Sequence, residues 1–201
     1  MGLRRWTTGG LTTGLVAVAV SCGGGRTAPP AAGDSYGAVP PLQGREVMVM
    51  PAQRVRGVPR AEVDPEIAFA LGERSERVGW VLPDQMRGLL ERSPAVQVSL
   101  DALPVAIFLQ AEVERVGDPL LGELIRIAAL TGADVALIPV EVRHRPAGAS
   151  APGAVEIVAA LLNARNGRVL WFGVVEGEPG SPGDPGALAT AADALARAVV
   201  W

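Results

Sequence analysis

The sequence predicts one domain of the α/β (α+β-like) class: a single mixed β-sheet flanked by helices, with a C-terminal β-hairpin and a closing helix. Short apolar runs typical of buried strands alternate with segments whose apolar residues repeat at helical spacing. The turn pair Asn166-Gly167 separates two strand-like runs, which is a strong signal for a hairpin. The chain has 201 residues, a length that suits one domain, and one sheet covered by helices buries both kinds of element.

The first half of the predicted domain contains short elements. Residues 46–50 are an apolar run closed by Pro51, which indicates a buried strand. Asp64 precedes Pro65 and is expected to cap a helix that ends near residue 72. The remaining expectations are a strand over 78–82, a short amphipathic helix through 86–90, a strand over 95–100, and a helical segment running from Asp101 to Val116.

The second half has the clearest patterns. Apolar residues at helical spacing over 120–128, with Asp118-Pro119 before them and Gly132 after them, predict a capped helix. Residues 135–142 predict a strand, which Pro139 makes an edge or bulged strand. The other expectations are a polar loop over 144–153, hairpin strands over 155–162 and 169–175, a mobile loop over 177–186, and a helix capped by Asp184 with Leu188, Ala192, Leu195 and Val199 on one face.

The amino terminus is predicted to be a lipoprotein signal peptide over residues 1–21. Arg4 and Arg5 precede an apolar stretch over 11–20, which has the length of a signal-peptide core and is too short for a spanning helix. The tetrapeptide Ala19-Val20-Ser21-Cys22 resembles the lipobox of bacterial lipoproteins. That resemblance implies cleavage after Ser21 and acyl chains on Cys22. The alternative is a cysteine within an ordinary signal sequence or a buried amino-terminal helix.

Residues 22–44 are rich in Gly, Pro and Ala and predict a flexible tether that precedes a domain over 45–201. The alternative is a loop packed on the domain. Gly23 follows Cys22; in the lipoprotein sorting rule, Asp at this position retains a lipoprotein in the inner membrane. The resemblance therefore implies an outer-membrane location facing the periplasm, with the membrane itself as a partner through lipidated Cys22.

Composition excludes several classes of function. All 18 basic residues are arginine, and the net charge is −3, so a nucleic-acid partner is not expected. A phosphate-binding loop needs a lysine, and the chain has none. The chain has one cysteine and one histidine, so we expect no internal disulfide, no metal site and no cofactor.

The search for catalytic residues finds none. His144 is the only histidine, it lies between Arg143 and Arg145, and no nucleophile or orienting carboxylate is indicated for it. Glu112 and Glu114 are expected to diverge on a helix, and Glu176 and Glu178 to lie in a loop, so both pairs are interpreted as solvated acids rather than a paired-carboxylate site.

The candidate partner-binding residues are a small basic cluster, Arg54, Arg56 and Arg60, and the terminal Trp201. The cluster follows the first predicted strand and would suit an acidic partner, although a solvated face is the alternative. Trp201 ends the chain and would either pack back on the domain or contact a partner.

Two segments carry a family resemblance. Residues 124–140 contain Thr-Gly-Ala-Asp leading into a strand, and residues 155–171 contain a hairpin that ends in Val169-Leu170-Trp171. Together with the Ala-rich last helix, they resemble the small α/β domain of envelope lipoproteins related to the curli secretion channel and the amino-terminal domain of the Tol-system β-propeller protein. Relatives include channels, assembly factors and activators of wall synthesis. A pore is disfavoured here, because the one hairpin belongs to the domain's own sheet.

These observations predict a lipid-anchored bacterial cell-envelope protein that is not an enzyme and works as a protein-interaction or assembly module through another envelope protein. Two alternatives remain. One is a periplasmic hydrolase that uses carboxylates or His144, which requires acidic side chains to converge with His144 in a pocket. The other is a small-ligand carrier, which requires a sizeable apolar cavity.

Overall fold

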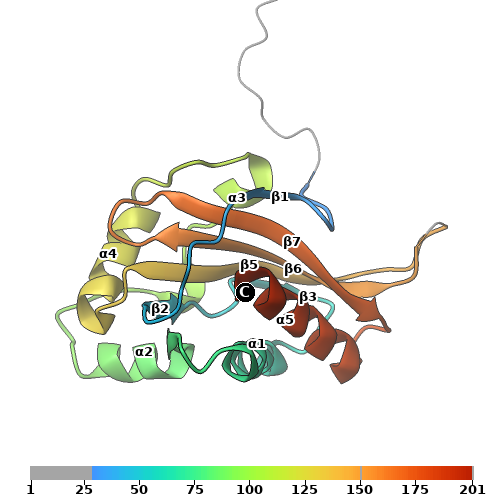
Figure 1. The fold of residues 1–201 in the computed structure, drawn as a ribbon, viewed down its shortest axis with the longest axis horizontal. Coiled ribbons are helices and arrows are strands. Elements are labelled where there is room, and N and C mark those ends of the chain that lie inside the picture. Colours follow the sequence, from blue (N-terminus) through green and yellow to red (C-terminus); the bar gives the residue numbers. More distant parts are fainter. Residues whose placement is uncertain (1–28, 150, 201) are drawn as a thin grey trace, which may run out of the picture.

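The computed structural model describes residues 29–149 and 151–200, and within them the predicted fold class is confirmed (Figure 1). One mixed, seven-stranded sheet has the order β1-β7-β6-β5-β2-β4, and β3 also pairs with β5. The strands are β1 (Ser35–Gly37), β2 (Glu46–Val49), β3 (Arg54–Arg56), β4 (Gly79–Val81), β5 (Val135–Arg145), β6 (Ala154–Asn163) and β7 (Val169–Pro179). The helices are α1 (Arg60–Arg74), α2 (Pro83–Glu91), α3 (Ile107–Gln110), α4 (Leu120–Thr131) and α5 (Pro185–Val199), with a 3₁₀ turn at Leu100–Ala102.

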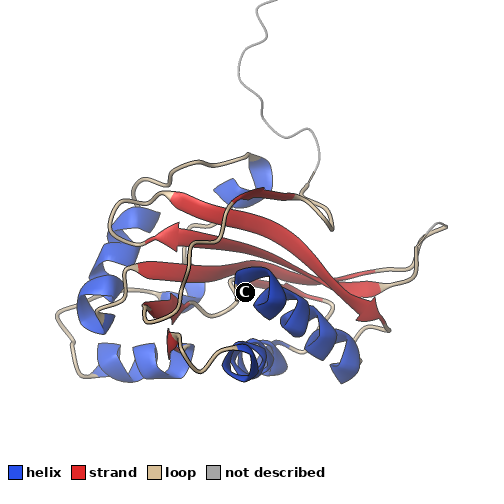
Figure 2. Cartoon of the chain, viewed as in Figure 1, coloured by secondary structure: helices blue, strands red, loops and turns tan. Residues whose placement is uncertain are grey.

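Each face of the sheet carries its own apolar core, and the helices surround the sheet (Figure 2). On one face Val135 and Leu137 of β5 pack with residues of α1 and α5. On the other face Ala136 and Ile138 pack with residues of α2, α3 and α4. Successive side chains of a strand point to opposite faces, so the continuous apolar run at the start of β5 follows from coverage on both sides.

Pro139 lies in an interior strand at a bulge, so the bulged alternative of the prediction is confirmed. β5 pairs antiparallel with β6, and the register shifts between Pro139 and Glu141. On its other side, β5 pairs first with β2 and then with β3. Pro139 faces the connection between those two strands, where its carbonyl accepts from the Gln53 N–H at 3.0 Å. A proline without an N–H is tolerated because, on the side of β5 that faces β2 and β3, no strand ladder is formed at this point.

The three Asp-Pro pairs have different roles. Asp184 caps α5 as predicted, since its carboxylate accepts from the Gly186 N–H. Asp118 accepts from the Gly122 N–H in the first turn of α4, although Pro119 holds the cap position. The prediction for Asp64 is wrong: α1 begins at Arg60, and the Asp64 carboxylate instead accepts from the Ala52 N–H at 2.8 Å. That bond joins α1 to the connection between β2 and β3, which local spacing does not reveal.

The strand predicted over 95–100 and the helix predicted over 101–116 are also wrong. This region holds only the 3₁₀ turn and α3, and the rest of it is irregular. Several of its apolar residues are nevertheless buried, including Leu100, Leu103 and Phe108. The side chain of Gln53 supplies the missing backbone partners: its Nε2 donates to the Leu100 carbonyl, and its Oε1 accepts from the Leu103 N–H. Because a distant side chain satisfies this backbone, no ladder is required.

Two predicted loops begin later than expected, because the strands before them are longer. β5 continues to Arg145, and β7 continues to Pro179. Gly177 belongs to β7 at the point where α5 crosses it: a Cβ there would lie 2.6 Å from the Ala191 nitrogen and 2.7 Å from the Ala187 oxygen. The glycine that suggested a loop is therefore required for close packing of a helix on a strand.

The described part of the predicted tether lies against the domain. β1 pairs antiparallel with β7, and the ring of Tyr36 stacks on that of Phe172 with centroids 4.9 Å apart. Pro30 is buried, and Leu42 is 4% exposed. The structure thus differs from the tether prediction over residues 30–44, because this segment supplies an edge strand and apolar side chains to the sheet. Packing on the domain begins before residue 45.

Candidate functional site

The predicted basic cluster is divided between two parts of the fold. Arg54 and Arg56 lie on β3, whereas Arg60 is the first residue of α1. Arg56 forms an ion pair with Glu141 at 2.5 Å, and Arg60 lies 3.7 Å from Asp101. A partner-binding role for these residues stays a prediction. Ser21, Cys22 and Trp201 lie outside the described residues.

Arg56 belongs to a row of alternating charges that crosses four strands. We name it the charged ladder, and its members are Arg56 of β3, Glu141, Arg143 and Arg145 of β5, Glu156 of β6 and Glu176 of β7. Glu141, Arg143 and Arg145 are two residues apart along β5, so their side chains share one face. Arg143 stands directly opposite Glu156 in the register, and Glu156 opposite Glu176. The ladder is therefore a product of strand pairing.

The two central carboxylates of the ladder are almost completely buried. Glu141 is 1% exposed and Glu156 is 2% exposed. Arg143 Nη1 lies 3.1 Å from Glu141 Oε2, its Nη2 lies 2.7 Å from Glu156 Oε2, and Arg145 Nε lies 2.8 Å from Glu156 Oε1. Buried carboxylates need such cations, because an unpaired charge in the interior is very costly. These glutamates are thus held as ion-pair partners, which favours a structural role over proton transfer.

Arg143 also fixes the amino-terminal segment on the sheet. Its Nη2 donates to the Pro30 carbonyl at 2.6 Å, in addition to the contacts with the two glutamates. Further along, the Gly33 N–H donates to the Val174 carbonyl and the Val174 N–H to the Asp34 carbonyl. One guanidinium therefore joins the buried carboxylates of the sheet to the segment that leads toward Cys22.

A second charged site is a groove of about 500 Å³ between α1 and α2. Arg87 lies on the α2 side, 2.8 Å from Asp84 and 2.9 Å from Asp101. Asp64 of α1 lines the same groove, and burial raises the pKa of its carboxyl, against the opposing effects of the Ala52 N–H, Arg60 and Arg87. The groove carries both signs of charge, and its cations are already paired with its acids.

Asp64 is expected to make part of the protein's stability depend on pH. Its folded-state pKa lies above the ordinary value of 3.8, so the folded protein binds this proton more tightly than the unfolded chain. The contribution of Asp64 to stability therefore falls as pH rises through the interval between 3.8 and its folded pKa. Asp64→Asn keeps an oxygen for the Ala52 N–H and cannot ionise. Urea unfolding at several pH values should show the variant gaining stability relative to the parent toward neutral pH; parallel profiles would contradict this.

The carboxylates do not converge on His144. His144 Nε2 is 2.9 Å from the Gly180 carbonyl oxygen. It lies three residues after Glu141 on β5, so its side chain is on the opposite face of the sheet from the charged ladder. Among the described residues, no group of three or more His, Cys, Asp or Glu side chains could hold a metal ion.

The other acidic pairs are placed differently from the prediction. Glu112 and Glu114 lie in an irregular, extended segment rather than on a helix, and both are exposed beside a groove of about 570 Å³. Glu176 and Glu178 belong to β7 rather than to a loop, and Glu176 pairs with Arg145. The Glu176 carboxylate is thus taken up by an arginine, and the Glu178 N–H donates to the Thr190 hydroxyl of α5.

Sequence reasoning did not single out Gln53, Arg143 as a structural cation, or the pair Glu141 and Glu156. A signal for Glu141 and Arg143 is present in the sequence: Glu141, Arg143 and Arg145 alternate with Val142 and His144 at strand spacing. Extending the predicted strand through this alternation would have placed the three charges on one face. The partner Glu156 follows only when the hairpin register is known.

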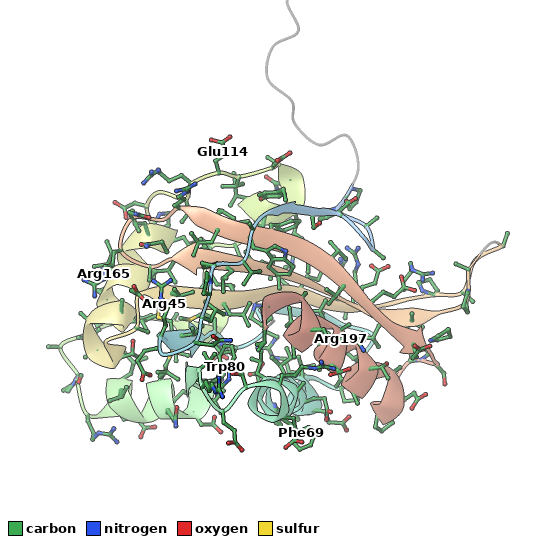
Figure 3. The ribbon with its side chains drawn as sticks, in the orientation of Figure 1. Arg45, Phe69, Trp80, Glu114, Arg165 and Arg197 are labelled. Carbon is green, nitrogen blue, oxygen red and sulfur yellow. The ribbon has the colours of Figure 1, made fainter. Side chains whose placement is uncertain are left out.

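The aromatic and large apolar side chains at the surface are few. Phe69 of α1 is 64% exposed and points away from the sheet (Figure 3). Trp80 of β4 is half-buried, and its Nε1 donates to the Ser75 carbonyl at the end of α1. Phe69 and Trp80 lie on the side of the molecule that carries α1 and the open edge of the sheet.

No protein family and no curated protein matches the sequence. Several solved structures have a similar fold. The C-terminal domain of LpoB from Salmonella enterica is 15% identical with a TM-score of 0.45, covering 69% of this chain and 86% of that chain. The same domain from Escherichia coli is 16% identical with a TM-score of 0.43, covering 67% and 83%. Lipoprotein GNA1162 from Neisseria meningitidis is 16% identical with a TM-score of 0.39, covering 69% and 84%.

Among the described residues, none of the helices is long and apolar enough to cross a membrane. The longest helices, α1 and α5, each contain 15 residues. Both are accounted for by packing, since their buried residues belong to the apolar core on one face of the sheet.

Proposed function

We propose that this protein is a lipid-anchored bacterial envelope protein whose domain acts, without catalysis, as an interaction or assembly module for another envelope protein. The observation that carries the proposal is the lipobox-like tetrapeptide ending at Cys22, which is the only cysteine of the chain. A thiol at this position would take a diacylglyceryl group, and each buried CH₂ contributes about 0.8 kcal/mol to membrane attachment. Gly23 after Cys22 supports an outer-membrane location facing the periplasm.

The chemistry of the domain supports the non-enzymatic part of the proposal. The buried carboxylates Glu141 and Glu156 are each paired with arginines, and His144 faces the other side of β5. Proton transfer by a carboxylate or imidazole requires it to reach a reacting group, whereas these glutamates are occupied by guanidinium groups. The exposed residues that a partner could contact include Arg54 and Phe69.

Cys22→Ala should release the protein from the membrane. In the parent, we expect the protein to sediment with membranes and to dissolve only in detergent, because acyl chains hold it there. The variant should remain soluble after membrane sedimentation, and mass spectrometry of the parent should show the acylated residue. Cys22→Ser is the conservative control, because it keeps the size of the side chain and removes the thiol. A bare thiol in the parent would contradict the proposal.

The interaction role needs a separate experiment. Crosslinking in intact cells, followed by purification of the anchored protein, should recover the same envelope protein from repeated preparations. Substituting Arg54 with glutamate reverses an exposed charge and should weaken that crosslink if the predicted basic surface contributes to binding. Arg165→Glu, an exposed position in the β6–β7 turn, is the matched control for charge reversal.

A further inference from the structure

The groove of about 570 Å³ beside Glu112 and Glu114 is bordered by one continuous stretch of chain. All of its lining residues lie within 111–120 except Pro104 and Ile107. The buried part of the lining is apolar and consists of Val113, Val116 and Leu120. A groove that follows the chain in this way suits an extended peptide better than a small molecule, which a ligand site largely encloses.

The segment that borders the groove has backbone groups available for pairing. Two backbone hydrogen bonds, from the Val116 N–H and to the Glu114 carbonyl, join its inner edge to the start of β7. These bonds flank the antiparallel pair of Arg115 and Arg168, so the N–H and carbonyl of Arg115 point away from β7. Within the described residues neither group has a hydrogen-bond partner. Arg115 therefore offers one donor and one acceptor to an incoming strand.

The groove also carries a net negative charge. Glu112, Glu114 and Asp118 line it, against the single cation Arg115, whose Nη1 donates to the Asn166 carbonyl at 2.7 Å. Glu112 and Glu114 are exposed, and within the described part of the chain their carboxylates form no ion pair or hydrogen bond. Figure 3 shows Glu114 pointing outward from the rim of the molecule. Unlike the acids of the charged ladder, these two carboxylates are available to a cation from outside.

Ile107 of α3 adds an apolar contact at the same place. Its side chain is 46% exposed, which makes it one of three large apolar residues with high exposure in the described chain. It lines the groove together with the exposed Pro104. An apolar side chain of a partner would remove this surface from water, which favours association.

We propose that this groove binds an extended segment of the partner protein in which basic and apolar residues alternate, and that the segment pairs through its backbone with Arg115. This inference rests on the interaction role proposed above. Strand addition gains affinity from main-chain hydrogen bonds and specificity from the side chains. Because successive side chains of a strand point to opposite sides, the basic residues reach Glu112 and Glu114 while the apolar residues cover Ile107 and the buried lining.

Peptide binding tests the proposal. A short synthetic peptide that alternates arginine and valine would carry a fluorophore, and its anisotropy would be followed as full-length protein in detergent is added, with the detergent alone as the blank. A peptide that alternates glutamate and valine has the same apolar content and the opposite charge. We expect saturable binding of the arginine peptide only, weakened by added salt because the charges are exposed. Equal binding of the two peptides would overturn the proposal.

A double substitution, Glu112→Gln with Glu114→Gln, tests the location of the site. It should weaken binding of the arginine peptide by about fivefold, the loss expected for two exposed ion pairs. Glu73→Gln with Glu76→Gln removes the same charge from exposed positions at the end of α1 and before β4, and this control should bind as the parent does. Equal weakening by the two double substitutions would show non-specific attraction and overturn the site.

Two N-methylated forms of the arginine peptide test the backbone pairing. One form carries its methyl groups on the valines and the other on the arginines, so each loses the N–H groups along one edge of a strand. Only the edge that meets Arg115 needs its N–H groups. One form should therefore bind about tenfold more weakly than the other, a factor that corresponds to one lost backbone bond. Equal binding of the two forms would overturn the strand pairing.

Crosslinking in cells separates this inference from the proposed function. Glu112→Gln with Glu114→Gln should weaken the crosslink to the envelope protein, and the Glu73 and Glu76 control should not. Equal crosslinks from both would overturn the groove as the docking site and leave the interaction role intact, whereas absence of any crosslink from the parent would overturn both. A dimer of the parent that Glu112→Gln with Glu114→Gln dissociates, measured by light scattering, would make a second copy of the chain the occupant and would also overturn the proposal.

Discussion

Replacing Arg143 with alanine is expected to lower the free energy of unfolding by about 3 kcal/mol, as removal of one partner from a buried ion pair typically does. The guanidinium lies between Glu141 and Glu156, which are 1% and 2% exposed, and also holds the Pro30 carbonyl. Its loss leaves buried negative charge with fewer cations. Arg56 and Arg145 remain beside the two glutamates and limit the loss. Urea unfolding followed by circular dichroism measures the change.

Arg197→Ala is the matched control for this substitution. Arg197 pairs with Asp193 at 3.1 Å on the exposed side of α5, and an exposed pair of this kind contributes roughly 0.3–0.5 kcal/mol. Arg143→Lys tests the geometry, because lysine keeps the charge but cannot bind two carboxylates and a carbonyl with one planar group. The free energy of unfolding of the Arg143→Lys protein should lie between those of the parent and of Arg143→Ala. If Arg143→Ala lowers the free energy of unfolding no more than Arg197→Ala does, Arg56 and Arg145 are enough to neutralise the two buried glutamates.

Phe172→Ala is expected to destabilise the protein by about 3–5 kcal/mol, the usual cost of truncating a buried aromatic ring. Phe172 is completely buried in the core that α2, α3 and α4 cover. Its ring stacks on Tyr36 at 4.9 Å and faces Phe108 at 6.3 Å between centroids. It therefore joins β1 and α3 through β7. Denaturant unfolding measures the total loss.

The same variant should loosen the amino-terminal segment. Limited proteolysis under native conditions is expected to cut the Phe172→Ala protein between residues 29 and 44 faster than the parent, because the ring on which Tyr36 stacks has been removed. Phe69→Ala is the control, since Phe69 is 64% exposed and surface substitutions usually change stability by less than about 0.5 kcal/mol. Equal effects of the two substitutions would contradict the placement of Phe172 in the core.

The patterns that sequence analysis predicted well are local. The helix over α4 follows from its apolar spacing, and Gly132 has the left-handed conformation, with φ of 75°, that a glycine C-cap adopts. The hairpin of β6 and β7 follows from its strand patterns and the Asn166-Gly167 turn. In these elements each residue's conformation is dictated by neighbours within a few positions, so the sequence is sufficient to place them.

The patterns that failed involve distant contacts. Asp64 is bound to the Ala52 N–H, and Gln53 supplies partners to the irregular segment around Leu100 and Leu103. Local spacing instead predicted a helix cap at Asp64 and regular structure over 95–116. A side chain that bonds backbone from another element removes the need for local pairing, and nothing within the segment reveals it.

The same distinction between local patterns and distant contacts applies to the candidate functional residues. The sequence identified the lipobox-like motif at Cys22 and the arginines of β3, because these are properties of neighbouring residues. It did not identify the charged ladder, since Glu156 meets Arg143 only through the register of β5 and β6. The point at which the amino-terminal segment becomes fixed is another such property, because it depends on Arg143 reaching the Pro30 carbonyl, which lies 113 positions earlier in the chain.

The sequence by itself determined the fold class, the hairpin and the closing helix, since each depends on short-range periodicity or on a contiguous motif, and the lipid-attachment signal is a prediction of the same kind. Only the tertiary structure decided where the amino-terminal segment becomes fixed, how the buried glutamates are neutralised, and which edge of the sheet stays open. Those features depend on strand register and on contacts between distant residues. Such contacts form because burial of apolar groups and pairing of the buried charges support one another across the whole fold, and no single segment encodes that gain.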